Sequence, residues 1–325
     1  MKFAMKLSLA LLATVVLLLG AGVYPAYALA KKLRIAVIPK GTTHVFWKSV
    51  EAGAKKAGDE LGVEIIWKGP LREDDRAEEI KVVEQFTSEG VDGIVLAPLD
   101  FEALARPVTA AMQRKIPVVI FDSAVRGTAG KDFVSFVATN NKKGGQMAGE
   151  QLAKLLGGKG KVVLLRYSVG SASTDDRESG FLDVMKANPG IQMLVTNRYG
   201  GATVASAKDE SMKLVDQLKQ ADGVFCPNES STLGMLSALK DNNLASKVKF
   251  VGFDATPALV DALKAGDIKA LVAQNPTNMG YLGVKTVVAH IKGEKVDPVI
   301  DTGVKLVTPE SLSDPEMKKF LNIAE

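Results

Sequence analysis

The stretch "LRIAVIPKGTTHVFWKSVEAGAKKAGDELGVEIIW", from Leu33 to Trp67, holds one complete strand–helix–strand unit. Its first and last runs, 33–38 and 63–67, are short and nearly continuous in apolar residues, which is typical of strands buried on both faces. The segment 45–61 between them has the spacing of an amphipathic helix. Two such strands joined by a helix form the repeating unit of α/β folds.

The same alternation continues along the chain. Further apolar runs lie at 93–97, 117–121, 161–165, 191–196, 223–226, 249–253 and 269–273. Helical patterns cover 76–89, 104–115, 142–156 and 204–220. This order predicts doubly wound parallel sheets. Nine or more strands exceed one comfortable sheet, and the pattern restarts after "FVATNNKKGG" (136–145), so we expect two similar lobes.

The first 30 residues have the pattern of a signal peptide. Lys2 and Lys6 precede an apolar run, and small residues then allow cleavage after Ala28 or Ala30. The alternative is an uncleaved membrane anchor, but the run is slightly short for a span and contains Gly20, Gly22 and Pro25. We therefore expect an exported protein with no membrane span after cleavage.

Composition excludes several classes of protein. Without the leader's two lysines the chain has 39 basic residues against 37 acidic ones, which is too balanced to indicate a nucleic-acid partner. The single cysteine, Cys226, rules out an internal disulfide and ends an apolar run, so a buried structural thiol is expected rather than a reactive one. No cofactor or metal site is predicted, because metal-binding residue patterns and phosphate-loop spacings are missing.

The residues that follow the strands are the candidates for a site, because ligands of open α/β sheets bind beyond the carboxyl ends of the strands. Aromatic, carboxylate, amide and arginine side chains all occur there. The candidate ligand-binding residues are Thr43, His44, Phe46, Trp47, Asp122, Ser123, Arg177, Asn228, Asp254 and Gln274.

This set suits an uncharged ring that carries several hydroxyl groups. Each hydroxyl both donates and accepts a hydrogen bond, so carboxylates take its proton while amides and arginine complete its bonding. Flat aromatic side chains cover the apolar faces of such a ring. Phe46 and Trp47 could do this, or could simply pack the first helix against the sheet.

Each polar candidate has a structural alternative. Asp122 could cap the next segment, and Asp254 could start a turn. His44 could be a solvated loop residue, and Arg177 could pair with Asp175 or Asp176 on a helix surface. Because these residues share a position after the ends of strands, we favour a role in ligand binding over the structural alternatives. In contrast, "EDDRAEEIK" (73–81) is interpreted as a solvated helix start.

The chain resembles the periplasmic monosaccharide-binding proteins of the ribose-binding type, which serve ABC importers. The resemblance covers residues 33–307 and rests on "IPVVIFDS", "ATNNKKGGQMAGE", "DDRESGF", "FCPNESSTLGMLSAL" and "FVGFDATPALVDALKAGDIKALVAQNPTNMG", together with the opening stretch. It implies the type I periplasmic binding protein fold, with two doubly wound lobes joined by three hinge crossings. The implied crossings lie near 139–140, 274–275 and 303–304. The implied lobes are 31–139 plus 275–303 and 140–274 plus 304–325.

The resemblance also implies a function. Phe46 and Trp47 match the family's stacking aromatics, and Asp122, Arg177, Asn228, Asp254 and Gln274 match its polar ligands in kind. His44 stands where the ribose binder has Asn, Ser123 where it has Arg, and a small residue near Ala202 where it stacks a third aromatic. These departures imply a ligand other than plain ribose, such as a larger or differently substituted sugar or a cyclic polyol.

We therefore expect a monomeric periplasmic protein that traps a monosaccharide or polyol by hinge closure and delivers it to the membrane permease of an ABC importer. One alternative is a sensory protein that presents the same ligand to a chemoreceptor or histidine kinase. Another is a sugar-modifying enzyme that uses Asp122 or Asp254 as a base, but nothing in the sequence indicates the tuned proton acceptor that this needs.

Overall fold

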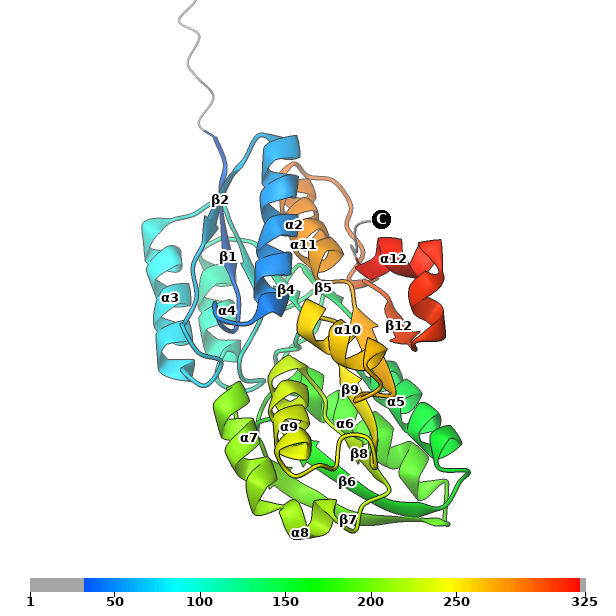
Figure 1. The fold of residues 1–325 in the computed structure, drawn as a ribbon. Helices are drawn as coiled ribbons and strands as arrows, with labels where there is room; N and C mark the ends of the chain where they lie inside the picture. Colours follow the sequence, from blue (N-terminus) through cyan, green and yellow to red (C-terminus); the bar gives the residue numbers. More distant parts are fainter. Residues whose placement is uncertain (1–31, 322–325) are drawn as a thin grey trace, which may run out of the picture. The chain divides into compact units, whose positions relative to one another are not determined.

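The structure is a computed structural model, and it describes residues 32–321. The predicted leader lies outside the described residues. Within them, the chain forms two six-stranded sheets, each covered by helices on both faces (Figure 1). We call each sheet with its helices a lobe. The predicted fold class, two similar doubly wound α/β lobes, is confirmed.

The sheet of the first lobe has the strand order β11-β5-β4-β3-β1-β2, and all its pairings are parallel. Its strands are β1 (Arg34–Ile38), β2 (Glu64–Trp67), β3 (Gly93–Leu96), β4 (Val118–Phe121), β5 (Ser135–Ala138) and β11 (Val299–Asp301). Its helices are α2 (Val45–Leu61), α3 (Arg76–Glu89), α4 (Ala105–Gln113) and α11 (Pro276–Ile291). Figure 1 shows α11 beside α2, although the two are far apart in sequence.

The sheet of the second lobe has the corresponding order β12-β10-β9-β8-β6-β7. Its strands are β6 (Gly160–Arg166), β7 (Ile191–Tyr199), β8 (Gly223–Phe225), β9 (Lys249–Phe253), β10 (Ala270–Gln274) and β12 (Val304–Val307). Its helices are α5 (Asn141–Leu155), α6 (Ala172–Lys186), α7 (Val204–Lys213), α8 (Val215–Leu218), α9 (Glu229–Asp241), α10 (Pro257–Lys264) and α12 (Pro315–Leu321), with the 3₁₀ turn η1 (Glu310–Ser313).

Three connections carry the chain from one sheet to the other: β5 to α5, β10 to α11, and β11 to β12. They lie close together, because Ala138 pairs with Asp301 in one sheet and Gln274 pairs with Val304 in the other. The Oγ1 atoms of Thr139 and Thr302 are 3.4 Å apart, which links two of the connections directly.

Alternation along the strands explains the core. In β1, Ile35 and Val37 pack on one face of the sheet while Ala36 and Ile38 pack on the other, and all four are fully buried. Both faces of each sheet are thus apolar, as the continuous runs predicted. Cys226 is buried in the core of the second lobe, as predicted, and burial raises the pKa of its thiol well above the usual value.

The prediction missed three strands and one helix break. β5, β11 and β12 have three or four residues each, and β12 is an antiparallel edge strand with the half-buried sequence "VKLV". Their apolar signal is therefore weak. The helix predicted over 204–220 ends at Lys213, and the short α8 follows after Leu214.

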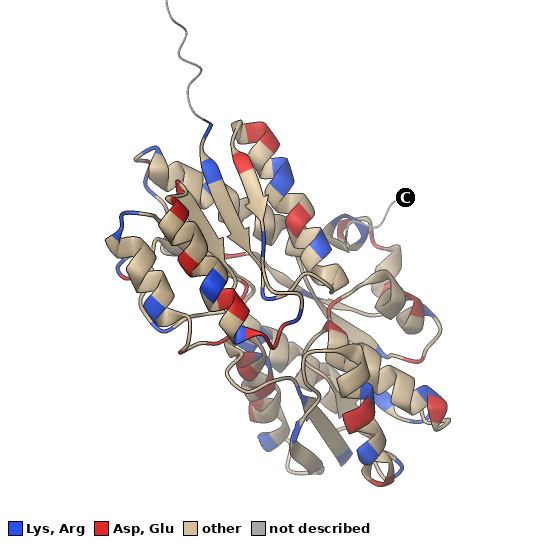
Figure 2. Cartoon of the chain, turned by 90° about the vertical axis from the view of Figure 1, so that its left-hand side faces the viewer, with Lys and Arg blue, Asp and Glu red and all other residues tan. Residues whose placement is uncertain are grey.

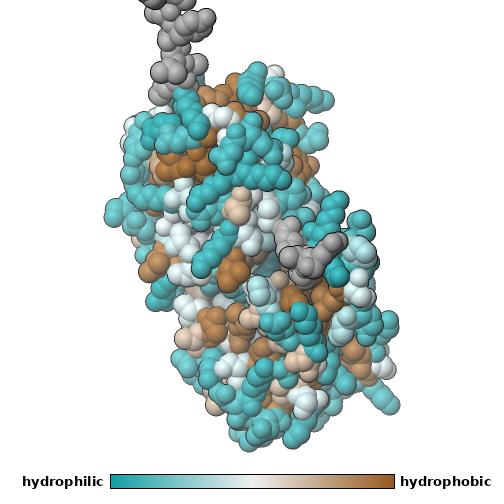
Figure 3. Space-filling model, turned by 45° about the horizontal axis from the view of Figure 1, so that its top comes forward, coloured by the Kyte–Doolittle hydropathy of each residue, from teal (hydrophilic) through white to brown (hydrophobic). Residues whose placement is uncertain are grey.

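The surface has no single dominant charge or apolar area on the faces drawn. Acidic and basic residues are interspersed along the helices in Figure 2, in keeping with the balanced composition. Hydrophobic residues reach the surface in separate patches among hydrophilic ones in Figure 3. Among the described residues, no helix combines the length and apolar character that crossing a membrane requires.

Candidate ligand-binding site

A cavity lies between the two lobes, where the carboxyl ends of both sheets meet. This is the position that the strand-end rule predicts. Its wall includes residues of the first lobe and of the second lobe, among them Gln274, the last residue of β10. The lining residues are Lys40, His44, Phe46, Trp47, Glu73, Asp122, Tyr167, Ser173, Thr174, Arg177, Asn228, Glu229, Asp254 and Gln274.

Eight of the ten predicted residues line this cavity, and Thr43 and Ser123 do not. Thr43 is exposed in the loop after β1. Ser123 is fully buried behind the wall, where its Oγ accepts a hydrogen bond from the Ser173 backbone N–H at 3.1 Å. Neither position therefore touches the cavity in this structure.

Two aspartates enter the cavity from equivalent strands. Asp122 follows β4 and Asp254 follows β9, and both have left-handed backbone conformations with φ of 61° and 72°. This conformation is uncommon outside glycine, although aspartate adopts it more readily than most residues, and it persists where the surrounding structure holds it. Both residues are buried, at 4% and 5% exposure. The left-handed residue directly follows each strand, and both aspartates line the cavity.

Asp254 is held by a small network. Its Oδ1 accepts a hydrogen bond from Gln274 Nε2 at 2.7 Å, and its Oδ2 accepts one from the Glu229 backbone N–H at 2.8 Å. Gln274 Oε1, also buried, has no hydrogen-bond partner in the part of the chain that the structure describes. Because a buried acceptor without a partner costs free energy, this oxygen is ready to accept a hydrogen bond from a ligand hydroxyl.

Arg177, on α6, is buried rather than paired on a helix surface. Its Nε donates to Asn141 Oδ1 at 2.8 Å, its Nη1 donates to the Pro227 carbonyl at 2.9 Å, and its guanidinium lies 4.0 Å from the centre of the Phe253 ring. Burial lowers its pKa, although Asp254 and Asp122 act in the opposite direction. The guanidinium is thus rigidly placed in the wall, with the two aspartates as its main electrostatic partners.

Asn228 has a structural task as well as a place in the wall. Its Oδ1 accepts hydrogen bonds from the backbone N–H and the hydroxyl of Ser231, which makes it the N-cap of α9 within a capping box. Its Nδ2 donates to Ser230 Oγ at 3.1 Å. One amide hydrogen of Asn228 remains for a ligand.

The positions of Phe46 and Trp47 are compatible with both of the roles that the sequence allowed. They pack in the apolar cluster between α2 and the sheet, and they also line the cavity. Their rings meet edge to face with centroids 5.0 Å apart, and Trp47 contacts Phe121 in the same way at 6.1 Å. The aromatic wall is therefore fixed by core packing.

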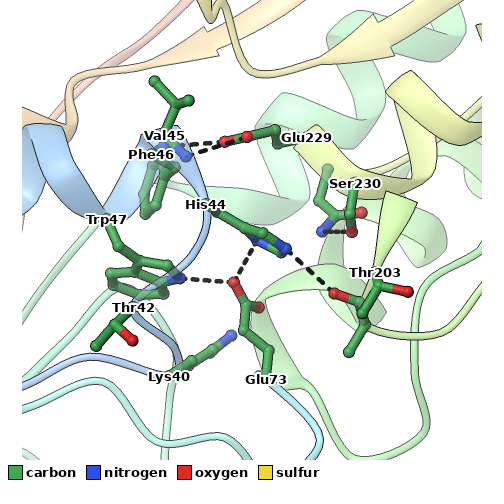
Figure 4. Close-up of polar contacts among 12 residues, drawn as sticks. Lys40, Thr42, His44, Val45, Phe46, Trp47, Glu73, Thr203, Glu229 and Ser230 are labelled. Atoms are coloured by element: carbon green, nitrogen blue, oxygen red, sulfur yellow. Dashed lines mark hydrogen bonds and ion pairs between the residues drawn. The ribbon is translucent and has the colours of Figure 1, made fainter. Parts of the chain in front are cut away.

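The interpretation of 73–81 as a solvated helix start is wrong for two residues. α3 begins at Arg76, and Glu79 is fully buried on it. Glu73 precedes the helix, is only 7% exposed and lines the cavity. Its Oε1 lies 2.6 Å from both Trp47 Nε1 and His44 Nδ1 (Figure 4). A charge run alone could not indicate that its first carboxylate turns inward.

The His44 ring is not solvated either. Its Nδ1 faces Glu73, and its Nε2 is 3.1 Å from the Ala202 carbonyl oxygen. Burial by itself would lower the pKa of His44, but the charge and hydrogen bond of Glu73 outweigh it and raise the pKa to about 9. Ala202 does not line the cavity. This small residue therefore adds no space to the cavity.

Sequence reasoning also missed Lys40, a buried cation at the end of β1. Its Nζ lies 3.2 Å from Asp122 Oδ2, 2.9 Å from Ser173 Oγ and 3.3 Å from Ser171 Oγ. Three partners match the three N–H groups of an ammonium. Lys40 thus supplies a positive charge beside Asp122. In the ribose binder, the resemblance places an arginine at the position of Ser123.

The described residues contain no group of three or more His, Cys, Asp or Glu side chains that could hold a metal ion. The wall combines carboxylate and amide acceptors with buried donors and two aromatic rings. Such a wall can bind hydroxyl groups and apolar ring faces at the same time.

Comparison with known proteins places the chain in a family. Residues 35–295 match the family described as periplasmic binding protein domain, so the chain belongs to this family. The ribose import binding protein of Haemophilus influenzae is 31% identical over 84% of this chain and 91% of its own length. The D-ribose/D-allose-binding protein of Pseudomonas aeruginosa is 30% identical over 92% and 97%, respectively. These relatives are binding proteins rather than enzymes.

Solved structures agree with this assignment. A carbohydrate transporter solute binding protein from Agrobacterium radiobacter, in complex with D-arabinose, superposes with a TM-score of 0.86, at 34% identity and over 90% of this chain and all of its own. An ABC transporter solute binding protein from Agrobacterium vitis, with bound D-fucose, gives a TM-score of 0.85 at 35% identity, over 88% of this chain and 98% of its own. The predicted fold of a type I periplasmic binding protein is thereby confirmed.

Proposed function

We propose that the protein binds one neutral monosaccharide or cyclic polyol in the cavity between its lobes. The observation that carries the proposal is the pairing of Asp122 and Asp254, two buried carboxylates that equivalent left-handed turns place in one cavity. Gln274 Oε1 adds an acceptor without a partner, and Phe46 and Trp47 add the aromatic surface.

The relatives narrow the choice of ligand. D-arabinose and D-fucose are bound to two structures that are 34% and 35% identical to this chain. This chain has His44 and Ser123 at positions where the resemblance gives the ribose binder Asn and Arg. The positive charge beside Asp122 comes from Lys40. We therefore propose a sugar such as D-arabinose or D-fucose as the ligand in preference to ribose.

The test is a thermal-shift screen of the purified protein. Pentoses, hexoses, deoxysugars and polyols are compared at equal concentration, with D-arabinose, D-fucose, D-ribose, D-allose and xylitol among them. A ligand that binds only the folded state raises the melting temperature by mass action. At least one neutral ring should raise it clearly, and a shift only with acidic sugars or amino acids would contradict the proposal.

We further propose that the protein is periplasmic and delivers its ligand to an ABC importer permease. In this proposal the segments 31–139 plus 275–303 and 140–274 plus 304–325 move as two bodies, and closure at the three connections buries the ligand. Two highly exposed apolar side chains support a docking rim on the closed form. Leu71 after β2 is 69% exposed and Val169 after β6 is 64% exposed, and a hydrogen bond of 2.6 Å from Arg76 Nη2 to the Val169 carbonyl joins the two lobes there.

Delivery and sensing can be separated by experiment. Leu71→Glu and Val169→Glu should keep sugar binding but abolish the stimulation of ATP hydrolysis in vesicles that contain the reconstituted permease and ATPase. A wild-type protein that binds sugar without stimulating this importer would favour the sensory role.

A further inference from the structure

Two carboxylates in the cavity wall bond to the opposite lobe. Glu73 belongs to the loop between β2 and α3 in the first lobe. Its Oε2 accepts a hydrogen bond of 2.7 Å from the hydroxyl of Tyr167, which follows β6 in the second lobe. Tyr167 is 1% exposed, so water does not compete for this bond. Since Oε1 of Glu73 also holds the indole N–H of Trp47, the same carboxylate fixes the aromatic wall.

Glu229 makes the reverse connection. It is the first residue of α9 in the second lobe, and its carboxylate accepts hydrogen bonds from the backbone N–H groups of Val45 and Phe46, at 3.1 and 2.9 Å (Figure 4). These are the first two residues of α2, whose own N-cap residue, His44, makes no side-chain capping bond. Free N–H groups at a helix start need an acceptor and attract negative charge. Glu229 therefore caps α2 from the other lobe.

His44 completes the set. Its two ring nitrogens face Glu73 in its own lobe and the Ala202 carbonyl in the second lobe, and both neighbours are acceptors. A doubly protonated imidazolium satisfies both contacts at once. The contacts of Glu73, Glu229 and His44 thus all span the cleft, and each needs the two lobes close together.

We propose that Glu73 and Glu229, with Tyr167 and His44, form an interlobe latch that stabilises the closed cleft. The latch residues position the lobes and the aromatic wall, and Asp122 and Asp254 select the ligand. When the lobes separate, the Glu73 carboxylate loses Tyr167 and the α2 amides lose Glu229. The latch rests on the proposed function only in that a ligand is what the closed cleft holds.

The test uses Tyr167→Phe and Glu229→Gln in the full mature chain. The matched control is Tyr281→Phe, because the Tyr281 hydroxyl also donates to a glutamate, Glu60, at 2.6 Å, but both residues belong to the first lobe. Stopped-flow binding is measured with two sugars of different affinity from the thermal-shift screen. Melting of each ligand-free variant shows that it is folded.

Each latch variant should raise the dissociation rate about tenfold, the value of one hydrogen bond to a charged group. The association rate should stay unchanged. Tyr167 and Glu229 also line the cavity, but the hydrogen bonds that the two variants remove join one lobe to the other, so the factor should be the same for both sugars. The control should match wild type. An unchanged dissociation rate, or an increase in this rate that differs between the two sugars, would overturn the latch.

A second readout keeps the two proposals apart. If wild type binds no sugar, the proposed function fails, and small-angle scattering of the ligand-free proteins then decides about the latch. Tyr167→Phe and Glu229→Gln should have a larger radius of gyration than wild type and Tyr281→Phe. Equal radii for all four proteins would overturn it.

Discussion

Asp122 and Asp254 occupy the same place in the two lobes. Each follows a strand that is third from the edge in the corresponding sheet order, each comes directly after a buried phenylalanine, and each has a positive φ. The backbone N–H of each bonds to a carbonyl of the neighbouring strand, Val137 for Asp122 and Val272 for Asp254. The site therefore uses one local device twice.

This relationship predicts the effect of removing either charge. Asp122→Asn and Asp254→Asn keep a residue that tolerates the left-handed turn. Each should weaken sugar binding by about 10- to 100-fold, since hydrogen bonds to charged groups contribute ~1.5–3 kcal/mol. Calorimetric titration measures the affinity. Ser123→Ala should weaken binding only slightly, and unchanged affinity in both aspartate variants would show that the site is misplaced.

Trp47 should report the ligand by fluorescence. The chain has two tryptophans, Trp47 in the cavity wall and Trp67 at the end of β2. A ligand against the indole changes its surroundings, so Trp67→Phe should keep the ligand-induced change in emission and Trp47→Phe should abolish it. Persistence of the change in Trp47→Phe would contradict a contact between the ligand and this indole.

The His44–Glu73 pair predicts a pH dependence of stability. Burial opposes both charges, but their mutual attraction raises the pKa of His44 from 6.5 to about 9 and lowers that of Glu73 from 4.5 to about 2. The histidine contribution is complete below pH 6.5 and is lost as the pH rises through about 9. The glutamate contribution is complete above pH 4.5 and is lost as the pH falls through about 2.

The contribution of this pair to the melting temperature should therefore be highest between about pH 4.5 and 6.5. Differential scanning calorimetry of wild type should show a fall of several degrees from pH 6.5 towards pH 9. His44→Gln should flatten this alkaline limb. The same fall in both proteins would assign the dependence to other groups.

Close helix packing predicts a coupling between stability and binding. A Cβ atom on Gly145 of α5 would lie 1.8 Å from the Arg177 carbonyl oxygen on α6. Gly145→Ala must push the two helices apart, and it should lower the free energy of unfolding by about 1–3 kcal/mol. It should also weaken sugar binding, because Arg177 moves with α6.

The control for this change is Gly223→Ala in the same lobe. The atoms nearest to its Cβ would be side-chain atoms of Leu152 and Leu156. Gly223 lies at the start of β8, at the opposite end of the strand from the site. It should cost stability with little effect on affinity. Denaturant titration and calorimetry give the two quantities, and loss of stability without loss of affinity in Gly145→Ala would contradict the coupling.

The sequence predicted the architecture because parallel strands buried on both faces are apolar throughout. β9 and the helices α2 and α3 were predicted with their observed limits. The position of the cavity followed from the strand-end rule, so residues directly after a strand, such as Asp122 and Asp254, could be found. Thr43 and Ser123 share that position in sequence but face elsewhere.

Two residues of the cavity wall, Glu73 and Lys40, could not be predicted from the sequence. Glu73 stands in a charged run, and nothing local distinguishes it from a solvated carboxylate. Its partners His44, Trp47 and Tyr167 are distant in sequence, and Tyr167 belongs to the other lobe. Lys40 is likewise a single charge at a strand end whose partners lie on Asp122 and on α6 with its preceding loop. Contacts between lobes depend on how two separate surfaces meet, which no periodicity encodes.

The three connections between the two sheets affect how the chain can fold during its synthesis. Helix α11 supplies Met279, Val284 and Val287 to the same apolar cluster as Ile35 and Val37, and β11 completes the first sheet. The amino-terminal lobe therefore cannot finish folding on the ribosome until residues up to Asp301 have emerged. Domains usually fold in order of synthesis. Here the first sheet gains its edge strand β11 only when almost the whole polypeptide has been made, so its amino-terminal part cannot reach the final structure earlier.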